Sequence, residues 1–245
     1  MHDRLEDAGI DGSPAALTRT GSDLDTLWRD PNLLFAQTCG YPLSTALRGV
    51  VRVVATPCYR FPGCDGPTHR SLLIVPGTSP HRELAALRGR RLAINGWDSN
   101  SGMNLLRAMV ARLAAGKRFF SAVTVTGSHV ESIAAVGRGD ADLAAIDNVT
   151  WGHMVRWRPG LTAAVRVIGE TPATPALPFI TARRTPIPTL RRLRDALAAV
   201  MADPTLAPIR DTLGLWGIVV PDPGAYRRVL ALERAAIAAG YPTLA

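Results

Sequence analysis

Short apolar runs of strand length alternate with helix-like segments along the middle of this chain, and this rhythm limits the fold more than any other feature. Three such runs lie at residues 92–94, 123–125 and 143–146. Between them, apolar residues recur three or four positions apart, as they do on one face of a helix. Continuous apolar strands that alternate with helices are typical of a parallel sheet covered on both faces. We therefore expect an α/β protein whose sheets are mostly parallel and flanked by helices.

The same pattern extends on both sides of this block. Residues 33–36, 50–55 and 72–75 are further apolar runs of strand length, and a loop is predicted at residues 56–70. In the C-terminal part, residues 190–200, 206–213 and 226–239 are predicted to be helical. The sequence thus combines an α/β body with a helical C-terminal part.

Two proline-rich segments, at residues 76–80 and near residues 181–188, interrupt the alternation. We interpret them as the places where one lobe is inserted into another. Lobe I then comprises residues 1–78 and 182–245, and lobe II comprises residues 79–181. The two crossing segments would form a hinge.

The composition fits a globular protein with a substantial core, because 47% of the 245 residues are hydrophobic and 20% are charged. The formal net charge is +8, and Lys117 is the only lysine among 28 basic residues. Nucleic-acid binding is one interpretation of such a charge. However, the basic runs are short, and aromatic residues do not alternate with them as a stacking surface requires. We expect no nucleic-acid partner, and the charge is compatible with an anionic ligand.

No segment approaches the roughly 20 apolar residues of a membrane-spanning helix. The N-terminus is acidic and lacks the apolar core of a signal peptide. The sequence as it stands therefore predicts neither a membrane span nor an export signal.

Three cysteines, Cys39, Cys58 and Cys64, lie within 26 positions. No second cluster accompanies them, and no CxxC pair is present, so a structural zinc site is not expected. One disulfide with one free thiol fits this spacing and would favour an oxidising compartment. Three reduced thiols fit it equally well.

The clearest candidate for a binding site is the turn Ser99, Asn100, Ser101, Gly102, which joins a predicted strand to a predicted helix. The two serines offer hydroxyl groups, and the glycine lets a ligand approach the backbone. Unpaired N–H groups and a partial positive charge at a helix start favour an oxyanion such as phosphate. An ordinary N-cap explains the turn equally well.

Two further candidates are predicted at the carboxyl ends of neighbouring strands. Ser128 and His129 begin the next helix, where Ser128 with Glu131 matches a capping box. Asp147 follows the next strand. Ligands of open α/β sheets bind beyond these strand ends, so the three elements together favour a ligand site more than any one of them does. A carboxylate beside an anion site requires that the ligand carry a donor or a proton.

No catalytic motif stands out. The G-x-S-x-G, Walker A, G-x-G-x-x-G and H-E-x-x-H patterns are absent, and the five histidines are scattered. We expect no metal and no cofactor. The alternative hypothesis is an enzyme on the same fold that acts on a small anionic metabolite, with His129 and Asp147 as its acid and base.

Four segments follow one another in an order that is more specific than any single motif. They are LRGRRLAI at residues 87–94, DSNSG at 98–102, TGSH at 126–129 and AVGRGDADLAAID at 135–147. Together with residues 37–42, 56–64 and 233–242, they resemble the phosphate/phosphonate-type periplasmic substrate-binding proteins of ABC transporters. The similarity extends over most of residues 20–245.

The resemblance implies a type II periplasmic-binding fold, in which two lobes joined by a two-segment hinge close over a small anion. It implies a non-catalytic, monomeric solute-binding protein that serves an ABC transporter permease, and a periplasmic location. The residues that it places near the ligand are Ser99, Ser101, Ser128, His129 and Asp147 from the second lobe, and Thr38, Tyr41 and Tyr59 from the first. Asn100 and Gly102 of the turn complete the predicted site.

Two features depart from that family. Asn100 stands where a hydroxyl residue is common, which leaves open whether phosphonates are strictly preferred. Residues 1–10 stand in place of a strand and a long helix. Either the first lobe lacks a strand, or the chain begins later than in the family, which would also remove a signal peptide. If Met1 is the true start, the protein is cytoplasmic.

Overall fold

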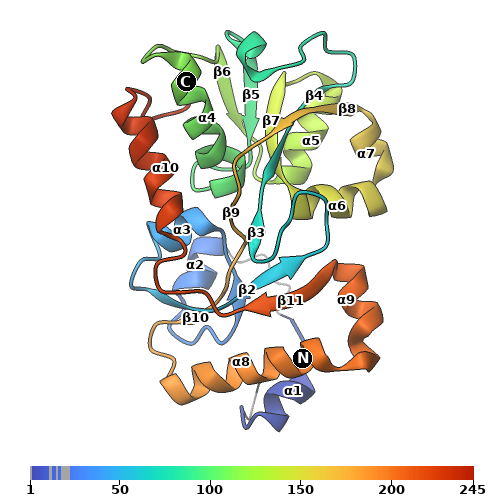
Figure 1. Ribbon diagram of the computed structural model, residues 1–245, viewed down its shortest axis with the longest axis vertical. Coiled ribbons are helices and arrows are strands. Elements are labelled where there is room, and N and C mark those ends of the chain that lie inside the picture. The colour runs from blue at the N-terminus through green and yellow to red at the C-terminus, as the bar shows by residue number, and fades with distance from the viewer. Residues whose placement is uncertain (1, 11–12, 15, 18–22) are drawn as a thin grey trace. The chain divides into compact units, whose positions relative to one another are not determined.

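The chain divides into two units, each built around its own β-sheet (Figure 1). The computed structural model describes residues 2–10, 13–14, 16–17 and 23–245. The first unit consists of Met1–Arg60, Asp65–Pro67 and Pro175–Ala225, and the second of Phe61–Cys64, Thr68–Thr174 and Tyr226–Ala245. The α/β organisation expected from the sequence is confirmed.

The sheet of the first unit has the strand order β1–β10–β2–β11, and every neighbouring pair in it is antiparallel. Its strands are β1 (Ala36–Gln37), β2 (Val51–Tyr59), β10 (Phe179–Ala182) and β11 (Leu215–Val219). The prediction of a mostly parallel sheet is therefore wrong for this unit. A strand covered on both faces is an apolar run whatever the direction of its neighbours, so the pattern of β2 did not encode their direction.

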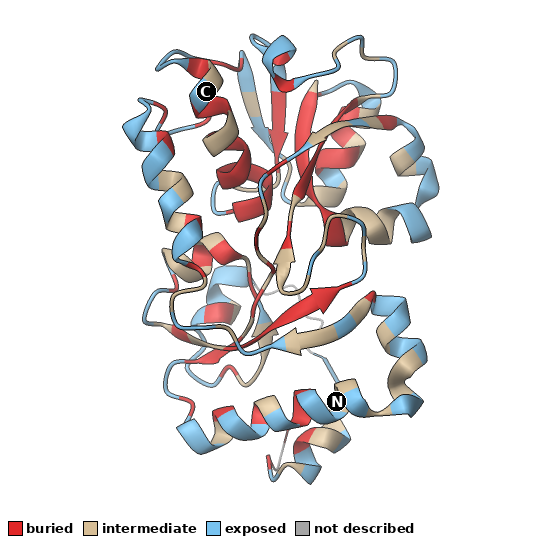
Figure 2. Cartoon of the chain, viewed as in Figure 1, coloured by how far each residue is buried: buried red, intermediate tan, exposed pale blue. Residues whose placement is uncertain are grey.

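Helices and loops supply the core on the two sides of this sheet. The helices are α1 (His2–Asp7), α2 (Leu24–Arg29), α3 (Gly40–Ser44), α8 (Ile187–Ala202) and α9 (Ala207–Leu213), with a 3₁₀ turn, η3 (Pro204–Leu206). Leu190, Leu193 and Leu197 form the buried stripe of α8 and pack with Val54 of β2. Figure 2 shows buried patches along α8 and over much of β2. Trp28 of α2 packs in a separate cluster with other residues of β2 and β10.

The sheet of the second unit is mixed and has the order β6–β5–β7–β4–β8. Its strands are β4 (Ser71–Pro76), β5 (Arg91–Ile94), β6 (Ala122–Val125), β7 (Leu143–Asp147) and β8 (Val165–Glu170). β5 is parallel to β6 and β7, whereas β4 is antiparallel to β7 and β8. The predicted parallel arrangement thus holds for β5, β6 and β7 only. Because β4 is hydrogen-bonded on both sides within this sheet, residues 68–78 belong to the second unit and not to the first.

Helices cover both faces of this sheet (Figure 1). They are η1 (Leu84–Leu87), η2 (Asn100–Asn104), α4 (Leu105–Ala114), α5 (His129–Arg138), α6 (Asn148–Trp157), α7 (Pro159–Ala163) and α10 (Arg227–Ala238). Ile133 and Val136 of α5 pack into a core with β4, β5 and β7. α10 lies beside α4, where Arg107 donates to the Pro242 carbonyl oxygen at 2.8 Å. This packing places residues 226–245 in the second unit, in contrast to the predicted lobe boundary.

The chain passes between the units three times within residues 60–68, once at residues 174–175 and once at residues 225–226. β3 (Thr68–His69) and β9 (Thr174–Pro175), in the first two of these segments, pair as a small sheet. That these segments act as a hinge stays a prediction. No helix in the described part of the chain is both long and apolar enough to cross a membrane.

Candidate functional site

The turn at residues 99–102 begins its helix through a π-helical turn. Ser99 Oγ accepts a hydrogen bond from Gly102 N at 2.9 Å, so the N-cap that the sequence allows is present. The backbone bond from Asn104 N to Ser99 O, at 3.0 Å, has the wider π spacing. Single π turns are frequent at functional sites. Here the turn places Ser101 at the start of a continuous helical run into α4.

Ser101, His129 and Asp147 contact one another within the second unit. Ser101 Oγ lies 2.8 Å from His129 Nε2, and Asp147 Oδ2 lies 3.3 Å from the same nitrogen. A Ser-His-Asp catalytic triad uses one ring nitrogen for the hydroxyl and the other for the carboxylate, so this arrangement is not a triad. A neutral His129 with its proton on Nε2 leaves the Ser101 hydroxyl hydrogen available to an acceptor, such as the oxygen of an anion.

Gly102 is required by close packing around this contact. A Cβ at this position would lie 1.9 Å from Asn95 Oδ1 and 3.1 Å from His129 Cε1. Asn95 follows β5, so the end of this strand, the helix start and the imidazole meet at Gly102. The glycine therefore allows both side chains to approach the backbone of the turn.

The charges of this group are set by burial and by hydrogen bonds. Burial lowers the pKa of His129, and the nearby Asp147 carboxylate and Ala145 carbonyl only partly offset it. Burial also opposes ionisation of Asp147, but His129, the Thr150 side chain, His69 and the Thr150 N–H outweigh it and hold the pKa of Asp147 below its ordinary value. Burial thus favours the neutral form of the His129 imidazole, whereas the hydrogen bonds and the two nearby histidines favour the charged form of the Asp147 carboxylate.

His69 belongs to the same group and was missed in the sequence analysis. It lies on β3 with 1% of its surface exposed, and burial lowers its pKa while Asp147 opposes that shift. Its Nδ1 atom has no hydrogen-bond partner among the described residues. The same holds for Ser71 Oγ, and Ser71 on β4 is paired with Asp147 on β7. Buried polar atoms without partners are uncommon and indicate water or a ligand. Only the position of His69 just before an apolar strand could have suggested its role.

The Asn100 side chain points into a buried network that joins η2 to α10. Its amide donates to Thr174 Oγ1 at 3.1 Å, and Asn104 donates to Asn100 Oδ1 at 3.0 Å. Asn104 also accepts from Arg107 at 2.8 Å and donates to the Val229 carbonyl at 3.2 Å. The Asn100 side chain thus supports the turn structurally.

Two other predicted site residues also serve as helix caps. Ser128 Oγ accepts from Glu131 N at 3.0 Å at the start of α5, as the capping-box pattern predicts. Asp147 Oδ1 accepts from Thr150 N at 2.9 Å at the start of α6. The Asp147 carboxylate contacts the His129 ring, whereas the Ser128 side chain caps α5 and is next to His129 in the sequence.

The remaining predicted residues, Thr38, Tyr41 and Tyr59, lie in the first unit. Thr38 is 2% exposed, and its Oγ1 atom has no hydrogen-bond partner within the described ranges. Gln37, its neighbour, donates to the Tyr59 hydroxyl at 3.1 Å, which ties the end of β1 to the end of β2. Tyr41 is half-buried in α3. A buried hydroxyl without a partner makes Thr38 the best-marked ligand candidate of this unit.

The thiols and carboxylates give no sign of a metal centre. Cys58 and Cys64 are free thiols. Burial and the nearby Asp147 raise the pKa of Cys64 to about 12, so its thiol is protonated at neutral pH. Among the described residues, no three His, Cys, Asp or Glu side chains are placed to hold a metal ion.

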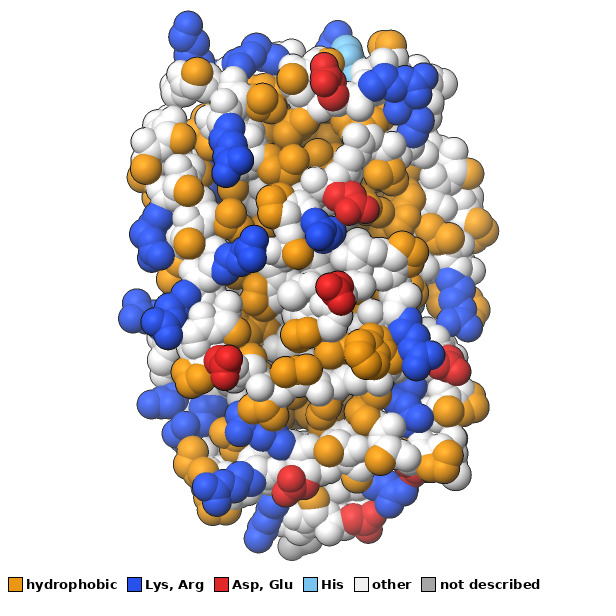
Figure 3. Space-filling view, viewed as in Figure 1, with side chains coloured by type: hydrophobic (Ala, Val, Ile, Leu, Met, Phe, Trp, Pro, Cys, Tyr) orange, Lys and Arg blue, Asp and Glu red, His pale blue; other side chains and the backbone are white. Residues whose placement is uncertain are grey.

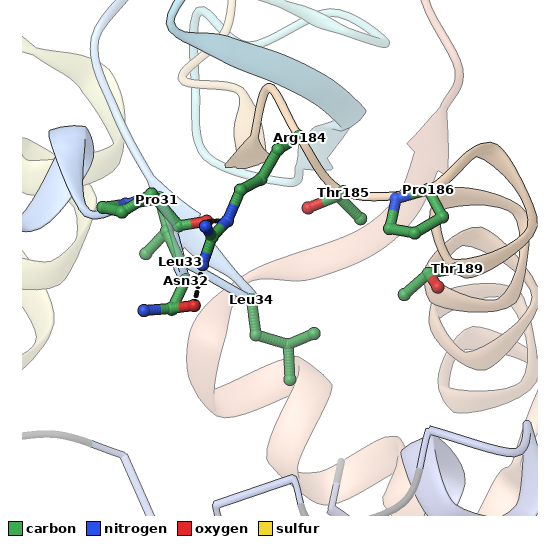
Figure 4. Close-up of a pocket in the computed structure, with 8 residues that line it drawn as sticks. All are labelled: Pro31, Asn32, Leu33, Leu34, Arg184, Thr185, Pro186 and Thr189. Carbon is green, nitrogen blue, oxygen red and sulfur yellow. Dashed lines mark hydrogen bonds between the residues drawn. The ribbon is translucent and has the colours of Figure 1, made fainter.

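Two hollows lie apart from these residues. One, of about 240 Å³, lies in the first unit and is drawn in Figure 4. Arg184 donates across it to the Pro31 carbonyl and to Asn32 Oδ1, so its guanidinium group links two segments of the chain. The other, of about 660 Å³, lies in the second unit between η1, α4 and α10, and Arg70, Glu83, Arg112 and Glu170 surround its largely apolar lining. Neither contains a residue of the predicted site.

The basic residues form no continuous stripe on the face shown in Figure 3, where arginines are dispersed among apolar and uncharged side chains. Many arginines bind neighbouring backbone or carboxylates; Arg91, for example, pairs with Asp142 at 2.9 Å. This distribution agrees with arginines on solvated faces.

Solved structures with a similar fold include binding proteins of ABC transporters. A binding protein component of an ABC phosphonate transporter from Pseudomonas aeruginosa superposes with a TM-score of 0.78 at 17% identity, over 97% of this chain and 81% of that chain. PhnD1 from Prochlorococcus marinus, in complex with methylphosphonate, gives 0.70 at 17% identity over 85% and 80%. A Xanthomonas citri protein bound to ATP gives 0.70 at 21% identity over 97% and 90%. At these identities the likeness shows the fold, so the expected type II periplasmic-binding fold is confirmed.

A search of curated proteins finds no matching sequence. Residues 33–226, which include all the predicted site residues, match the family described as "ABC transporter, phosphonate, periplasmic substrate-binding protein". The chain therefore belongs to the phosphonate-type periplasmic substrate-binding proteins of ABC transporters.

Proposed function

We propose that this chain binds a small phosphoryl oxyanion, phosphate or a phosphonate, and delivers it to an ABC transporter permease. Its family consists of substrate-binding proteins and not of enzymes. The observation that carries the proposal is the 2.8 Å contact between Ser101 Oγ and His129 Nε2 at the start of a helix. No feature of the described residues favours the enzyme hypothesis over binding, because one imidazole nitrogen serves both Ser101 and Asp147.

The helix start supplies the attraction for the anion in this proposal. The partial positive charge of the η2–α4 run and the backbone N–H groups of the turn favour negative oxygens. The Ser101 hydroxyl donates to the ligand, while Ser99 and Gly102 keep the turn in shape. Asn100 contributes through its backbone, since its side chain is engaged in the buried network.

The predicted ligand residues of the first unit are Thr38, Tyr41 and Tyr59. Thr38, with a buried and unpartnered hydroxyl, is the leading candidate there, and Tyr41 and Tyr59 add phenolic hydroxyls. A dissociation constant of about 1 μM requires about −8 kcal/mol. Hydrogen bonds to a charged group contribute about 1.5–3 kcal/mol each, so five or six of them suffice after ordering costs.

We further propose that the protein works as a monomer in the periplasm and docks on a membrane permease. The description of the family as periplasmic components of transporters supports the location and the permease partner in this proposal.

Thermal unfolding with and without candidate ligands tests the proposal. Phosphate, methylphosphonate and 2-aminoethylphosphonate are added to dialysed protein. A ligand present at 100 times its dissociation constant stabilises the folded state by about 2.7 kcal/mol, which raises the Tm of a chain this long by about 5 °C or more. The expected result is such a shift with at least one phosphoryl ligand. The absence of a shift with all three contradicts the proposal.

A further inference from the structure

We propose that the hollow of about 660 Å³ between η1, α4 and α10 is a second ligand site, which takes a small zwitterion with an apolar body, such as an apolar amino acid or dipeptide. All its lining residues belong to the second unit, and none is a residue of the predicted anion site. This second site is therefore separate from the proposed function and does not depend on it.

Small side chains along two neighbouring helices create the space. Ala108 and Ala111 of α4 line the hollow, as do Ala235 of α10 and Ala239 just after that helix. The two helices lie side by side (Figure 1), and larger side chains at these positions would fill the gap between them and η1. Sites for small organic ligands have volumes of about 300–1,000 Å³, so the hollow suits a molecule of the size of an amino acid or a dipeptide.

The lining of the hollow is largely apolar. Leu84 and Ala111 are buried, and Met109, Leu113 and Leu232 are partly exposed around them. An apolar guest removes this surface from water, which is favourable in proportion to the area that it covers. The unbranched Met109 side chain can adapt to guests of different shape. The lining therefore favours a ligand with a hydrocarbon or aromatic body.

Four charged residues at the hollow balance one another in sign, namely Arg70, Arg112, Glu83 and Glu170. Arg70 and Glu170 pair with each other at 3.9 Å. Glu83 and Arg112 have no ion-pair partner within the part of the chain that the structure describes, and the Glu83 side chain does not cap η1. One unpaired carboxylate and one unpaired guanidinium in the same hollow complement an ammonium group and a carboxylate on one ligand.

A ligand with a single charge matches this arrangement less well than a zwitterion. A carboxylate alone pairs with Arg112 and leaves its apolar body beside Glu83, and an amine alone does the reverse. The four formal charges sum to zero, so the hollow itself favours neither a net anion nor a net cation. The combination of apolar lining and opposite charges thus points to an apolar zwitterion.

A series of matched ligands tests each requirement by NMR titration of the folded protein at pH 7. L-phenylalanine has both charges and a ring. Of its analogues, 3-phenylpropanoate lacks the ammonium group, 2-phenylethylammonium lacks the carboxylate, and glycine lacks the ring. We expect phenylalanine to bind with a dissociation constant of about 1 mM or tighter, and each analogue to bind at least about threefold more weakly.

Leucyl-phenylalanine is titrated alongside, and the tighter of the two zwitterions tells whether a peptide or an amino acid is the natural source of the ligand. The absence of saturable binding of both zwitterions overturns the inference. Equal binding of phenylalanine and either singly charged analogue overturns it as well, because one of the two charges would then have no partner in the hollow.

Ala235→Trp places a large side chain in the hollow at an exposed position of α10. It should weaken binding of the zwitterion about tenfold or more. Ala198→Trp, at an exposed alanine of α8 in the other unit, is the matched control and should bind like the wild type. Circular dichroism checks that both variants are folded. Equal affinity of folded Ala235→Trp and wild-type protein overturns the inference, since the zwitterion then binds elsewhere.

Glu83→Gln and Arg112→Gln test the charges one at a time. Each should weaken binding of the zwitterion about threefold or more, whereas Asp195→Asn, on an exposed carboxylate of α8, should leave it unchanged. Unchanged affinity in both hollow variants overturns the inference. Sedimentation velocity provides a last check. A wild-type dimer that Ala235→Trp abolishes would show that a second copy of the chain covers the hollow, and this result also overturns a zwitterion site.

Discussion

His129 Nε2 lies 2.8 Å from Ser101 Oγ, although 28 positions separate the two residues in the chain. The contact joins the start of α5 to the start of the η2–α4 run across the ends of neighbouring parallel strands. It occurs where ligands of α/β sheets generally bind. The following predictions test whether it holds an anion and what maintains it.

Ser101→Ala should weaken methylphosphonate binding about 10- to 100-fold, because it removes one hydrogen bond to a charged ligand. Calorimetric titration measures the change. Ser121→Ala, at an exposed serine of the same unit, should leave the affinity unchanged. Equal affinities for Ser101→Ala and wild-type protein would remove Ser101 from the site.

Gly102→Ala should destabilise the protein and reduce binding together, because the new Cβ would lie 1.9 Å from Asn95 Oδ1 and displace His129. We expect a loss of about 1–3 kcal/mol in the free energy of unfolding. Gly160→Ala is the matched control, since a Cβ there meets nothing within 4 Å. If both substitutions behave alike in urea unfolding, the close packing at Gly102 is not important.

Asn104→Ala should cost about 3 kcal/mol or more in the free energy of unfolding. It removes hydrogen bonds to Asn100, Val229 and the buried Arg107 guanidinium at once. Denaturant unfolding gives the value, and Arg234→Ala on the exposed side of α10 is the control. A loss below about 0.5 kcal/mol would show that this network does not hold α10 against η2.

The free energy of unfolding should fall as pH decreases from 7.5 to 5.5. Burial lowers the folded-state pKa of His69 and His129, so the unfolded chain binds more protons below its histidine pKa of about 6.5. Stability therefore rises with pH in this range, by up to about 1.4 kcal/mol per pH unit for each such histidine.

His69→Gln separates this effect from other titrations. The variant should lose less stability than the wild type over the same pH range, whatever its stability at pH 7.5. Chemical denaturation at each pH provides the comparison with His81→Gln, on a histidine that is not fully buried. Parallel curves for wild type and His69→Gln would contradict a buried neutral imidazole at this position.

The parts of the fold that the sequence predicts best are those with local signals. β5 and β7 lie within one residue of their predicted bounds, and α5 begins where the sequence predicts, because apolar runs mark the strands and the Ser128 capping box marks the helix start. The direction and partners of β4 depend on hydrogen bonds to strands far away in the chain. The same reason explains why residues 226–245 were expected in the wrong unit: contacts between α10 and α4 have no local signal.

The candidate site shows the same division. Ser101, His129 and Asp147 could be named because each follows a strand, but only the fold shows that one ring nitrogen meets both other side chains. The engagement of Asn100 in a buried network, and the place of His69 beside Asp147, follow from tertiary packing. Neither residue has a neighbour in sequence that predicts its role.

Calorimetric titration of ligand-free protein with phosphate and methylphosphonate tests the central claim most directly. The account predicts saturable one-to-one binding of at least one of them, with a dissociation constant of about 1 μM or lower, weakened in Ser101→Ala and unchanged in Ser121→Ala. No saturable binding of either anion by folded protein would contradict it.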